Sequence, residues 1–343
     1  MSKKRQLLHS VALANQQSGG AKSTKMARTR HAKEFIEFCT SRGLDLTEPR
    51  DITQELFKGY ASYLATATCE RAANSIGSIH NKMAAVRKLL KKRGLDLEKL
   101  GVDRNIGLGV GARSRNGTKE PVTDAVFESA VSMAVAKGEN GFAHCIKLER
   151  YLGLRGLEAI MSPGALLNFA KEAESSVLRI PAIVTLLIVD GTKGGRPRET
   201  AVVGKFAAKT LEVIHDALEF AAANGGYLLI GKKPGLKASR TRYHKIAAMV
   251  GLVGKYAPHS LRYRYTCDKL EELRNEGVSR QEAMVLASKW LGHGPGRGRW
   301  VSMVYGKTVM HTFPKATRRQ SQKSALAKIK ALIAQFPQTG PVH

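Results

Sequence analysis

A glycine-rich, basic segment divides the chain into two regions with helical periodicity. Residues 104–120 have little apolar periodicity, and their glycines alternate with basic side chains: Gly107, Gly109, Gly111, Gly117, Arg113, Arg115 and Lys119. A helix is not expected to continue through this segment, because each glycine costs a helix about 1 kcal/mol relative to alanine. The sequence therefore predicts a linker over 104–120. The 343 residues of the chain fit a domain on each side of it.

The region before the linker predicts a bundle of three helices. The first begins near Ser23 and ends near Gly43, the second begins at Asp51 as a cap, and the third spans 72–93. The third helix ends in a cluster of basic residues: Arg87, Lys88, Lys91, Lys92 and Arg93. We expect a helical domain over 24–103. Residues 1–23 are mostly polar and are predicted to form a flexible basic arm.

The region after the linker predicts a mostly helical domain with one small sheet. Helical patterns run from Thr123 to about Leu152 and recur over 206–223, 236–250, 260–276 and 279–291. Aliphatic runs over 183–189 and 200–203 enclose a glycine-rich turn, which indicates a β-hairpin. The predicted fold class is mainly α with a small antiparallel β-sheet (α+β). This second domain spans 121–318, and 319–343 is expected to form a C-terminal helix.

The charge of the chain indicates a polyanionic partner. There are 56 Lys and Arg against 28 Asp and Glu, a formal net charge of +28, and both sides of the linker are basic. Such a surface attracts polyanions, of which nucleic acid is the commonest. Apolar residues make up 43% of the chain, enough to build cores, which excludes a largely disordered basic tail. Charge alone leaves a ribosome-associated or merely alkaline protein open.

The cysteines and apolar runs predict neither a metal site nor a membrane span. None of the four cysteines forms a CxxC pair, so a disulfide framework or a zinc site is not expected. No apolar run approaches the length that crosses a bilayer. We therefore expect reduced thiols, no metal, no membrane partner and a cytoplasmic location.

Four short motifs in the second region place charged groups at turns and helix ends. They are Gly153-Leu154-Arg155-Gly156-Leu157-Glu158, Lys193 in the hairpin turn, His259-Ser260-Leu261-Arg262, and Leu291-Gly292-His293-Gly294 followed by Tyr305. Each alone has a plain structural interpretation: a surface ion pair, a solvated loop, two residues on one helical face, and a histidine at a helix end. Their order along the chain is much more specific than any one of them.

That order resembles the tyrosine recombinases, the family of phage integrases and Xer-type recombinases, over roughly residues 145–310. The resemblance implies six catalytic residues: Arg155, Lys193, His259, Arg262, His293 and Tyr305. It also implies that 24–103 is a core-binding domain, although architecture and not a motif supports that part. Glu158 matches an acidic position that the family often keeps after the first arginine.

The resemblance implies cleavage and rejoining of double-stranded DNA without a metal ion, ATP or another cofactor. The tyrosine hydroxyl would attack a phosphodiester to give a 3′-phosphotyrosine and a free 5′-hydroxyl. Arg155 and Arg262 would stabilise the charge on the phosphate oxygens. Lys193 would protonate the leaving oxygen, His259 would assist proton transfer, and His293 would hydrogen-bond the phosphate.

Two of these assignments depend on position along the chain. Tyr305 has no competing tyrosine in the sequence after Tyr265. The link over 294–300, however, is a few residues longer than is usual in the family, so attack in cis and in trans both stay open. Lys193 is preferred because it alone lies between the two strand-like runs, unlike Lys205, Lys232, Lys233 and Lys237.

Basic residues outside the motifs are candidates for phosphate contacts, which set affinity and register. They are Arg87, Lys88, Lys91 and Lys92 in the first domain, Arg113 and Arg115 in the linker, and Arg240, Arg242 and Lys245 in the second domain. The resemblance further implies a homotetramer on synapsed DNA, with a helix in 319–343 exchanged between subunits. Deleting 319–343 should then impair synapsis and leave DNA binding mostly intact. A directionality factor or a DNA-bending protein is a further partner that the resemblance leaves open.

The function expected is site-specific DNA recombination, by integration and excision or by resolution. A type IB topoisomerase shares this chemistry and is the nearest enzymatic alternative. A non-catalytic DNA-binding regulator on the same scaffold is an alternative of another class. A generic RNA-binding protein would explain the charge but not the order of the motifs. The sequence does not specify the DNA site.

Overall fold

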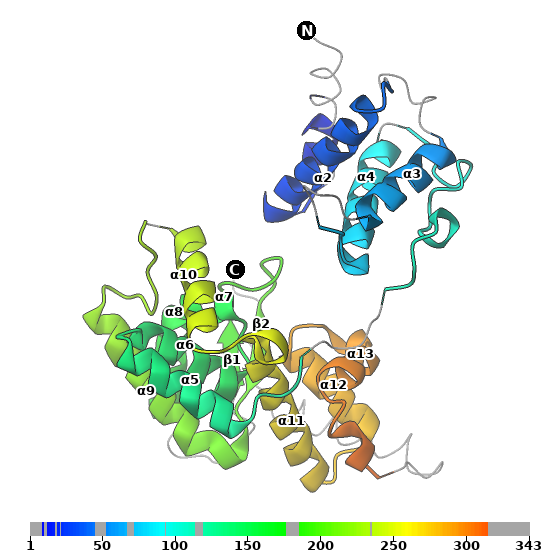
Figure 1. Ribbon diagram of the computed structural model, residues 1–343. Coiled ribbons are helices and arrows are strands. Elements are labelled where there is room, and N and C mark those ends of the chain that lie inside the picture. Colours follow the sequence, from blue (N-terminus) through cyan, green and yellow to red (C-terminus); the bar gives the residue numbers. More distant parts are fainter. Residues whose placement is uncertain are drawn as a thin grey trace, which may run out of the picture. The chain divides into compact units, whose positions relative to one another are not determined.

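The chain divides into two compact units, Met1–Arg115 and Asn116–His343. The computed structural model (Figure 1) describes residues 9, 12–17, 19–20, 22–44, 53–66, 72–92, 94–113, 119–175, 185–233 and 235–314. The division lies within the predicted linker. The linker begins later than predicted, however, because Leu108 and Val110 are buried in the core of the first unit. Arg115 and the C-terminal helix expected in 319–343 lie outside the described residues.

The first unit contains the three predicted helices. They are α2 (Lys22–Thr40), α3 (Gln54–Ala65) and α4 (Ile76–Lys92), followed by the short 3₁₀ helix η2 (Ile106–Leu108). Aromatic rings from α2 and α3 meet in the core, with the ring centroids of Phe35 and Tyr60 4.9 Å apart. The predicted cap of the second helix is wrong, because Thr53 and not Asp51 is the residue that caps α3. The Thr53 side chain accepts a hydrogen bond from the backbone N–H of Leu56.

Part of the predicted N-terminal arm packs on the first unit. Residues 12–17 are helical, and α2 already begins at Lys22. Ala14 is buried in the core, and the Asn15 side-chain amide donates to the Thr29 hydroxyl at 2.7 Å. A flexible arm is therefore the wrong description of this stretch, because a small apolar residue and a hydrogen-bonded amide attach it to α2.

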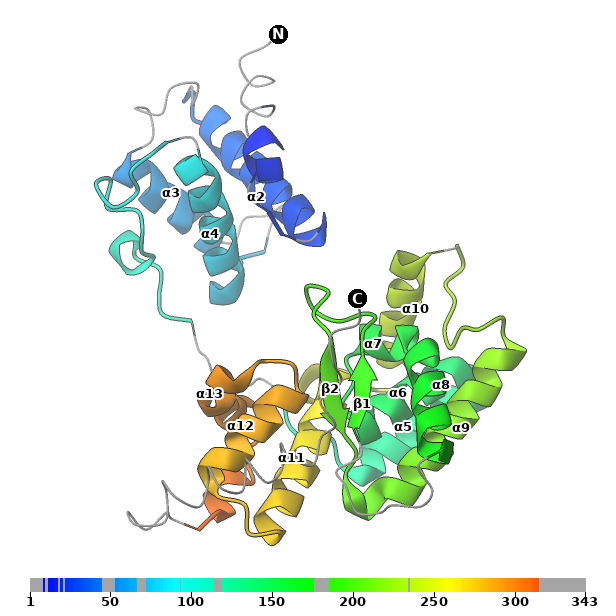
Figure 2. The same ribbon diagram turned by 180° about the vertical axis from the view of Figure 1, so that it is seen from behind.

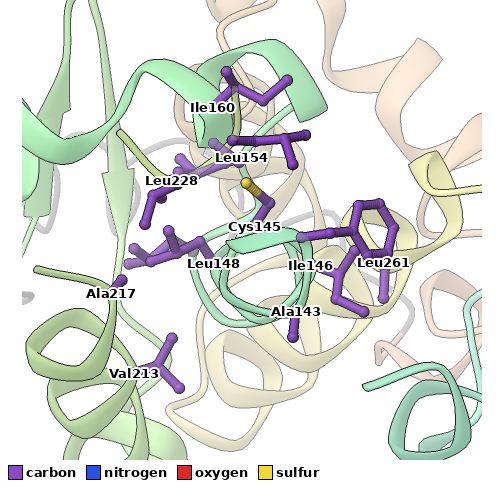
Figure 3. Packing of buried hydrophobic residues seen from close by; sticks show 14 of the residues in the cluster. Ala143, Cys145, Ile146, Leu148, Leu154, Ile160, Val213, Ala217, Leu228 and Leu261 are labelled. Atoms are coloured by element: carbon purple, nitrogen blue, oxygen red, sulfur yellow. The ribbon is translucent and has the colours of Figure 1, made fainter. Parts of the chain in front are cut away.

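The second unit is built around helix α6, which is buried along most of its length (Figure 3). Helices α5, α9 and α11 pack against α6. The elements of this unit are α5 (Asp124–Ala136), α6 (Asn140–Leu152), α7 (Gly156–Met161), α8 (Pro163–Ser175), β1 (Thr185–Ile188), β2 (Arg198–Ala201), η3 (Gly204–Phe206), α9 (Ala207–Ala223), α10 (Leu236–Met249), η4 (Gly254–Tyr256), α11 (His259–Asn275), α12 (Arg280–Trp290), η5 (Pro295–Arg297), α13 (Gly298–Val304) and η6 (Met310–Thr312).

The predicted hairpin forms a two-stranded antiparallel sheet (Figure 2). Its register pairs Thr185 with Ala201 and Ile188 with Arg198. Helix α8 packs on β1, and α12 packs on β2. The fold class predicted from the sequence is thereby confirmed. Because α12 precedes His293 in the chain, its packing on β2 brings the hairpin close to the last catalytic motif.

Three helices of the second unit have no counterpart among the sequence predictions. Helices α7 and α13 have only 6 and 7 residues, too few for a periodic pattern to be recognised. The sequence prediction also contained no element at α8. Within the described parts of the chain, no helix is both long and apolar enough to cross a membrane.

Candidate active site

The first motif turns the chain sharply between two helices. Helix α6 ends at Gly153, whose φ of 60° is left-handed and favours glycine. A Cβ at this position would also lie only 2.3 Å from the ring of Tyr265 on α11. The turn places Arg155 directly before α7, where its backbone N–H donates to the Glu158 carboxylate at 2.8 Å.

The fully buried side chain of Glu158 interacts with three arginines. It accepts hydrogen bonds from the guanidinium groups of Arg155 and Arg198, and its carboxylate lies 3.8 Å from Nη1 of Arg262. Burial by itself would raise the pKa of Glu158. The hydrogen bond and charge of Arg198, together with the charges of Arg262 and Arg155, outweigh burial and lower this pKa to about 2. Glu158 is therefore a carboxylate at neutral pH.

The two predicted catalytic arginines share one backbone acceptor. Nη2 of Arg155 donates to the carbonyl oxygen of Leu291 at 3.0 Å, and Nη2 of Arg262 donates to the same oxygen. Nη1 of Arg262 donates to the carbonyl oxygen of Gly153. Burial, with the charges of Arg198 and Arg155, lowers the pKa of Arg262 to about 9. Arg262 therefore stays cationic at pH 7, and its orientation is fixed by two carbonyl groups.

Tyr305 and His259 form a hydrogen-bonded pair. Nε2 of His259, the first residue of α11, lies 2.9 Å from the Tyr305 hydroxyl. The tyrosine is only 3% exposed, and its ring packs against Tyr263 with centroids 4.5 Å apart and against Trp300 with centroids 5.4 Å apart. Burial, with the charge of Arg262, lowers the pKa of His259 to about 4. The imidazole is therefore neutral at pH 7 and can accept a proton from the tyrosine.

His293 also lies near the ring of Tyr305. Its backbone N–H donates to the Ser288 carbonyl at 2.9 Å, and its ring centroid is 4.6 Å from Trp300 and 5.9 Å from Tyr305. Burial, with the charges of Arg262 and Arg155, lowers the pKa of His293 to about 3. Its Nε2 atom is buried and has no hydrogen-bond partner among the described residues. A buried polar atom of this kind is well suited to bind a phosphate oxygen.

A cationic cleft of about 830 Å³ lies beside these groups. Its charged and imidazole side chains are Arg155, Lys193, Arg196, Arg198, Glu199, Lys289, His293 and Arg297, so Glu199 is the one acid among the described lining residues. Lys193 projects from the exposed hairpin turn. Its competitor Lys205 instead pairs with Asp268 at 3.1 Å. No three His, Cys, Asp or Glu side chains are grouped as a metal site in the described ranges.

The structure therefore brings the six predicted catalytic residues into one region. Arg155 and Arg262 share the Leu291 carbonyl, and His259 and His293 both contact Tyr305. Arg155, His293 and Lys193 line the same cleft. Tyr263 and Tyr265, the two tyrosines next to Arg262, are both buried in the core.

Three residues of this region were not predicted from the sequence. Arg198 could have been found from strand alternation, which places it on the same face as Thr200. Trp300 packs on both His293 and Tyr305, but a tryptophan carries no spacing signal. Arg297 belongs to the long link after His293, and the sequence gives no indication that this link folds back on the cleft.

The predicted DNA contacts divide into exposed and internally bonded residues. Arg87 donates to the Val102 carbonyl, and burial lowers its pKa. Arg242 pairs with Glu139 at 2.7 Å and donates to the Ile230 carbonyl. The remaining described candidates have exposed side chains and stay predictions: Lys88, Lys91, Lys92, Arg113, Arg240 and Lys245.

Comparisons with known proteins agree with this geometry. Residues 109–268 match the model of a protein family described as integrase. The structure is similar to that of the Tn1549 transposon integrase in complex with transposon right-end DNA, with a TM-score of 0.52, 16% sequence identity, and coverage of 95% of this chain and 99% of that chain. Residues 109–268 of this chain are therefore similar to the integrases, and the chain shares the fold of the Tn1549 integrase. The family match includes the first four of the six predicted catalytic residues and ends before His293 and Tyr305.

Other solved recombinases are more distantly similar. The XerH site-specific recombinase bound to a palindromic difH substrate matches with a TM-score of 0.47 and 15% identity, over 81% of this chain and 74% of that chain. XerA recombinase matches with a TM-score of 0.31 and 14% identity, over 96% of this chain and 99% of that chain. No curated protein sequence matches this chain.

Proposed function

We propose that this chain is a tyrosine recombinase that carries out site-specific DNA recombination, with Tyr305 as the nucleophile. The observation that carries the proposal is the 2.9 Å contact between the Tyr305 hydroxyl and His259, beside two arginines that share the Leu291 carbonyl. A nucleophile needs an adjacent base, and a phosphodiester needs cations that stabilise its transition state. Both requirements are met within one group of contacts.

In the cleavage step, the oxygen of Tyr305 forms a bond to phosphorus while the bond from phosphorus to the 5′-oxygen breaks. The neutral imidazole of His259 accepts the tyrosine proton. Arg155 and Arg262 hydrogen-bond the non-bridging oxygens, where negative charge increases. Lys193 gives a proton to the leaving 5′-oxygen.

In the rejoining step, the 5′-hydroxyl of a second strand attacks the phosphotyrosine and releases Tyr305. The number of phosphodiester bonds is conserved, so no ATP is needed. The positive charge that a metal ion could supply comes from Arg155, Arg262 and Lys193 in this proposal. His293 binds a phosphate oxygen through its buried Nε2 atom in both steps. The pKa of His293 is about 3 in the DNA-free protein, so the ring is neutral there, and it donates to the phosphate from Nε2 in the tautomer that carries the proton on that nitrogen.

The DNA-free site must rearrange before it reacts. Tyr305 is 3% exposed and Arg262 is fully buried, so neither reaches a duplex on the surface in the state described. Tyr305 directly follows α13, a helix of seven residues, and packs on Trp300 within it. We infer that α13 shifts when DNA enters the cleft that Arg155 lines, and that this shift exposes the tyrosine.

Covalent trapping tests the proposed function. The full-length protein is mixed with sheared DNA from its own source in EDTA, denatured, and assayed for protein attached to DNA. We expect an adduct from the wild type and none from Tyr305→Phe. Tyr263→Phe is the matched control, because its ring lies 4.5 Å from that of Tyr305 and it should still form the adduct. An adduct from Tyr305→Phe would move the nucleophile to another residue.

The same trapped DNA separates the two alternative functions. Sequencing it gives the cleavage site, and a plasmid with two copies of that site reports recombination. Relaxation of a supercoiled plasmid without exchange between sites would favour the topoisomerase alternative. DNA binding without any adduct would favour a non-catalytic regulator. The tetramer implied by the family is tested on the same two-site plasmid, because exchange requires synapsis.

A further inference from the structure

We propose that Arg198 is a positioning residue that attaches the Lys193 hairpin to the two catalytic arginines and to the turn that carries His293. The proposal rests on the proposed function and extends it. Arg198 is the first residue of β2, five positions after Lys193, and it is only 6% exposed. No sequence motif points to it.

The first contacts of Arg198 are with the segment that holds Arg155. Its Nη2 donates to Glu158 at 2.6 Å and to the Gly153 carbonyl at 3.2 Å, while Nε donates to Glu158 at 3.2 Å. Glu158 also binds Arg155, and the Gly153 carbonyl also binds Arg262. The guanidinium of Arg198 therefore donates to two groups that also accept hydrogen bonds from the proposed catalytic arginines: Glu158, which binds Arg155, and the Gly153 carbonyl, which binds Arg262.

The second contacts are with the turn before His293. Nη1 of Arg198 donates to the carbonyl of Trp290, the residue before Leu291. The Arg198 side chain also crosses Gly292, where an added Cβ would lie 2.6 Å from its Cδ atom. Because Gly292 has a φ of 65° as well, both the backbone and the arginine require glycine next to His293.

The hairpin has a second attachment on the other side of Lys193. An added Cβ at Gly191 would lie 2.7 Å from the Leu157 carbonyl oxygen and 2.9 Å from the Glu158 nitrogen. The turn backbone therefore packs directly on α7. Lys193 lies between this contact and Arg198, so the turn that carries the proposed general acid is attached at both ends.

Arg198 acts through other residues and not on the DNA itself. Each of its three guanidinium nitrogens donates to a protein acceptor, and the residue is almost fully buried. Lysine at this position would keep a charge opposite Glu158 but would lose the planar set of donors that reaches both carbonyl groups. Arg198→Lys is therefore the informative variant, and Arg198→Gln is the stronger one.

Hydrogen exchange of the full chain tests the attachment without any DNA. For Arg198→Lys we expect faster amide exchange over residues 189–197 and 153–158, with the first unit unchanged. Arg196→Gln removes a cation from the same hairpin, where it makes no ion pair or hydrogen bond within the described residues, and should leave these amides unchanged. Unchanged exchange in Arg198→Lys would overturn the proposal. Uniform loss of protection across the second unit would also overturn it, because Arg198 would then serve the stability of the whole domain.

A sulfur-substituted substrate tests the chemistry. The trapped site is synthesised with sulfur in place of the bridging 5′-oxygen, because a thiol with a pKa of about 8.5 leaves without being protonated. With ordinary DNA, Arg198→Lys should cleave about 100-fold more slowly than the wild type, the size of a lost general-acid contribution. With the sulfur-substituted DNA, the variant and the wild type should cleave at nearly the same rate. If the variant stays about 100-fold slower on the sulfur-substituted DNA, Arg198 does not act through Lys193, and the proposal is overturned.

The two experiments separate the failure of this inference from that of the proposed function. If the wild type forms no adduct with any DNA, the proposed function fails, and the exchange comparison still decides whether Arg198 attaches the hairpin. If the wild type cleaves and Arg198→Lys cleaves equally fast, the inference alone fails.

Discussion

At the scale of single residues, the site depends on one buried carboxylate that holds several guanidiniums together. Glu158 offsets the mutual repulsion of Arg155, Arg198 and Arg262, which lie closer than free cations would. Removing one partner of a buried ion pair typically costs about 3–5 kcal/mol, because the remaining charges are left uncompensated. We therefore expect Glu158 to be as important for the arrangement of the arginines as the arginines are for phosphate binding.

The low pKa of Glu158 predicts a loss of stability in acid. Its pKa is about 2 in the folded protein against an ordinary value of 4.5, so the carboxylate stabilises the fold fully above pH 4.5 and ceases to do so as the pH falls towards 2. The shift corresponds to about 3 kcal/mol. Urea unfolding at several pH values should show the wild type losing more stability than Glu158→Gln below pH 4.5. Equal losses in the two proteins would contradict this assignment.

The two histidines of the proposed active site should be neutral in the DNA-free protein. Their pKa values of about 4 for His259 and about 3 for His293 lie below the ordinary 6.5. Between the folded pKa values and 6.5, these histidines bind more protons in the unfolded chain than in the folded protein. Their contribution therefore makes the free energy of unfolding rise with pH up to about 6.5. Nuclear magnetic resonance of labelled histidines, assigned with His259→Gln and His293→Gln, should show no titration of either ring above about pH 5. A midpoint near 6.5 for either would contradict the buried geometry.

At the scale of elements, the hairpin is held against α7 because Gly191 of the turn packs directly on the backbone of this helix. Gly191 and Gly194 test this as a matched pair. Both have left-handed backbones, with φ of 70° and 79°, but only Gly191 has atoms within 4 Å of an added Cβ. The pair therefore separates the cost of backbone strain from the cost of the contact with α7.

We expect Gly194→Ala to lower the free energy of unfolding by about 1 kcal/mol through strain. Gly191→Ala should lose roughly 1–3 kcal/mol more, because the methyl group collides with the Leu157 carbonyl. Urea unfolding of both variants measures the difference. Equal losses would mean that the turn is not held against α7.

Elements with a long apolar period could be predicted from the sequence, and short ones could not. The pattern around Phe35 and Phe38 predicts α2, and the two aliphatic runs predict the β-hairpin within a few residues. Helix α13 has too few residues for a period, and its position depends on the packing of Trp300 against the site. Arg198 was missed for a related reason. A buried arginine is recognised by its acceptors, and those of Arg198 are the Glu158 carboxylate and the Gly153 carbonyl from one segment and the Trp290 carbonyl from another.

At the scale of the whole molecule, both units are basic and each has its own core. Residues 1–117 hold 22 Lys and Arg against 10 Asp and Glu, and the remainder holds 34 against 18. A net charge of +12 before the second unit and +16 within it means that both can neutralise phosphates. DNA affinity should therefore depend on both units and fall steeply with salt.

The salt dependence identifies which lysines of the first unit contact DNA. Replacing Lys91 and Lys92 together by Gln should reduce the slope of log K against log salt by about 2, since each phosphate contact contributes about 0.9. Both side chains are exposed at the end of α4. Arg87→Gln is the control, because its guanidinium donates to Val102 and the slope should hardly change. A larger change for Arg87 than for the lysine pair would reverse this assignment.

The carbonyl oxygen of Leu291, which Arg155 and Arg262 share, has a consequence for how related sequences can diverge. Every amino acid carries that oxygen, so another apolar side chain that fits the buried position 291 would keep the acceptor. The neighbouring Gly292 has no such freedom, because its backbone and the crossing arginine both exclude a side chain. Distant relatives that keep this arrangement should therefore be recognisable by a glycine before the histidine, even where the residue ahead of it has changed.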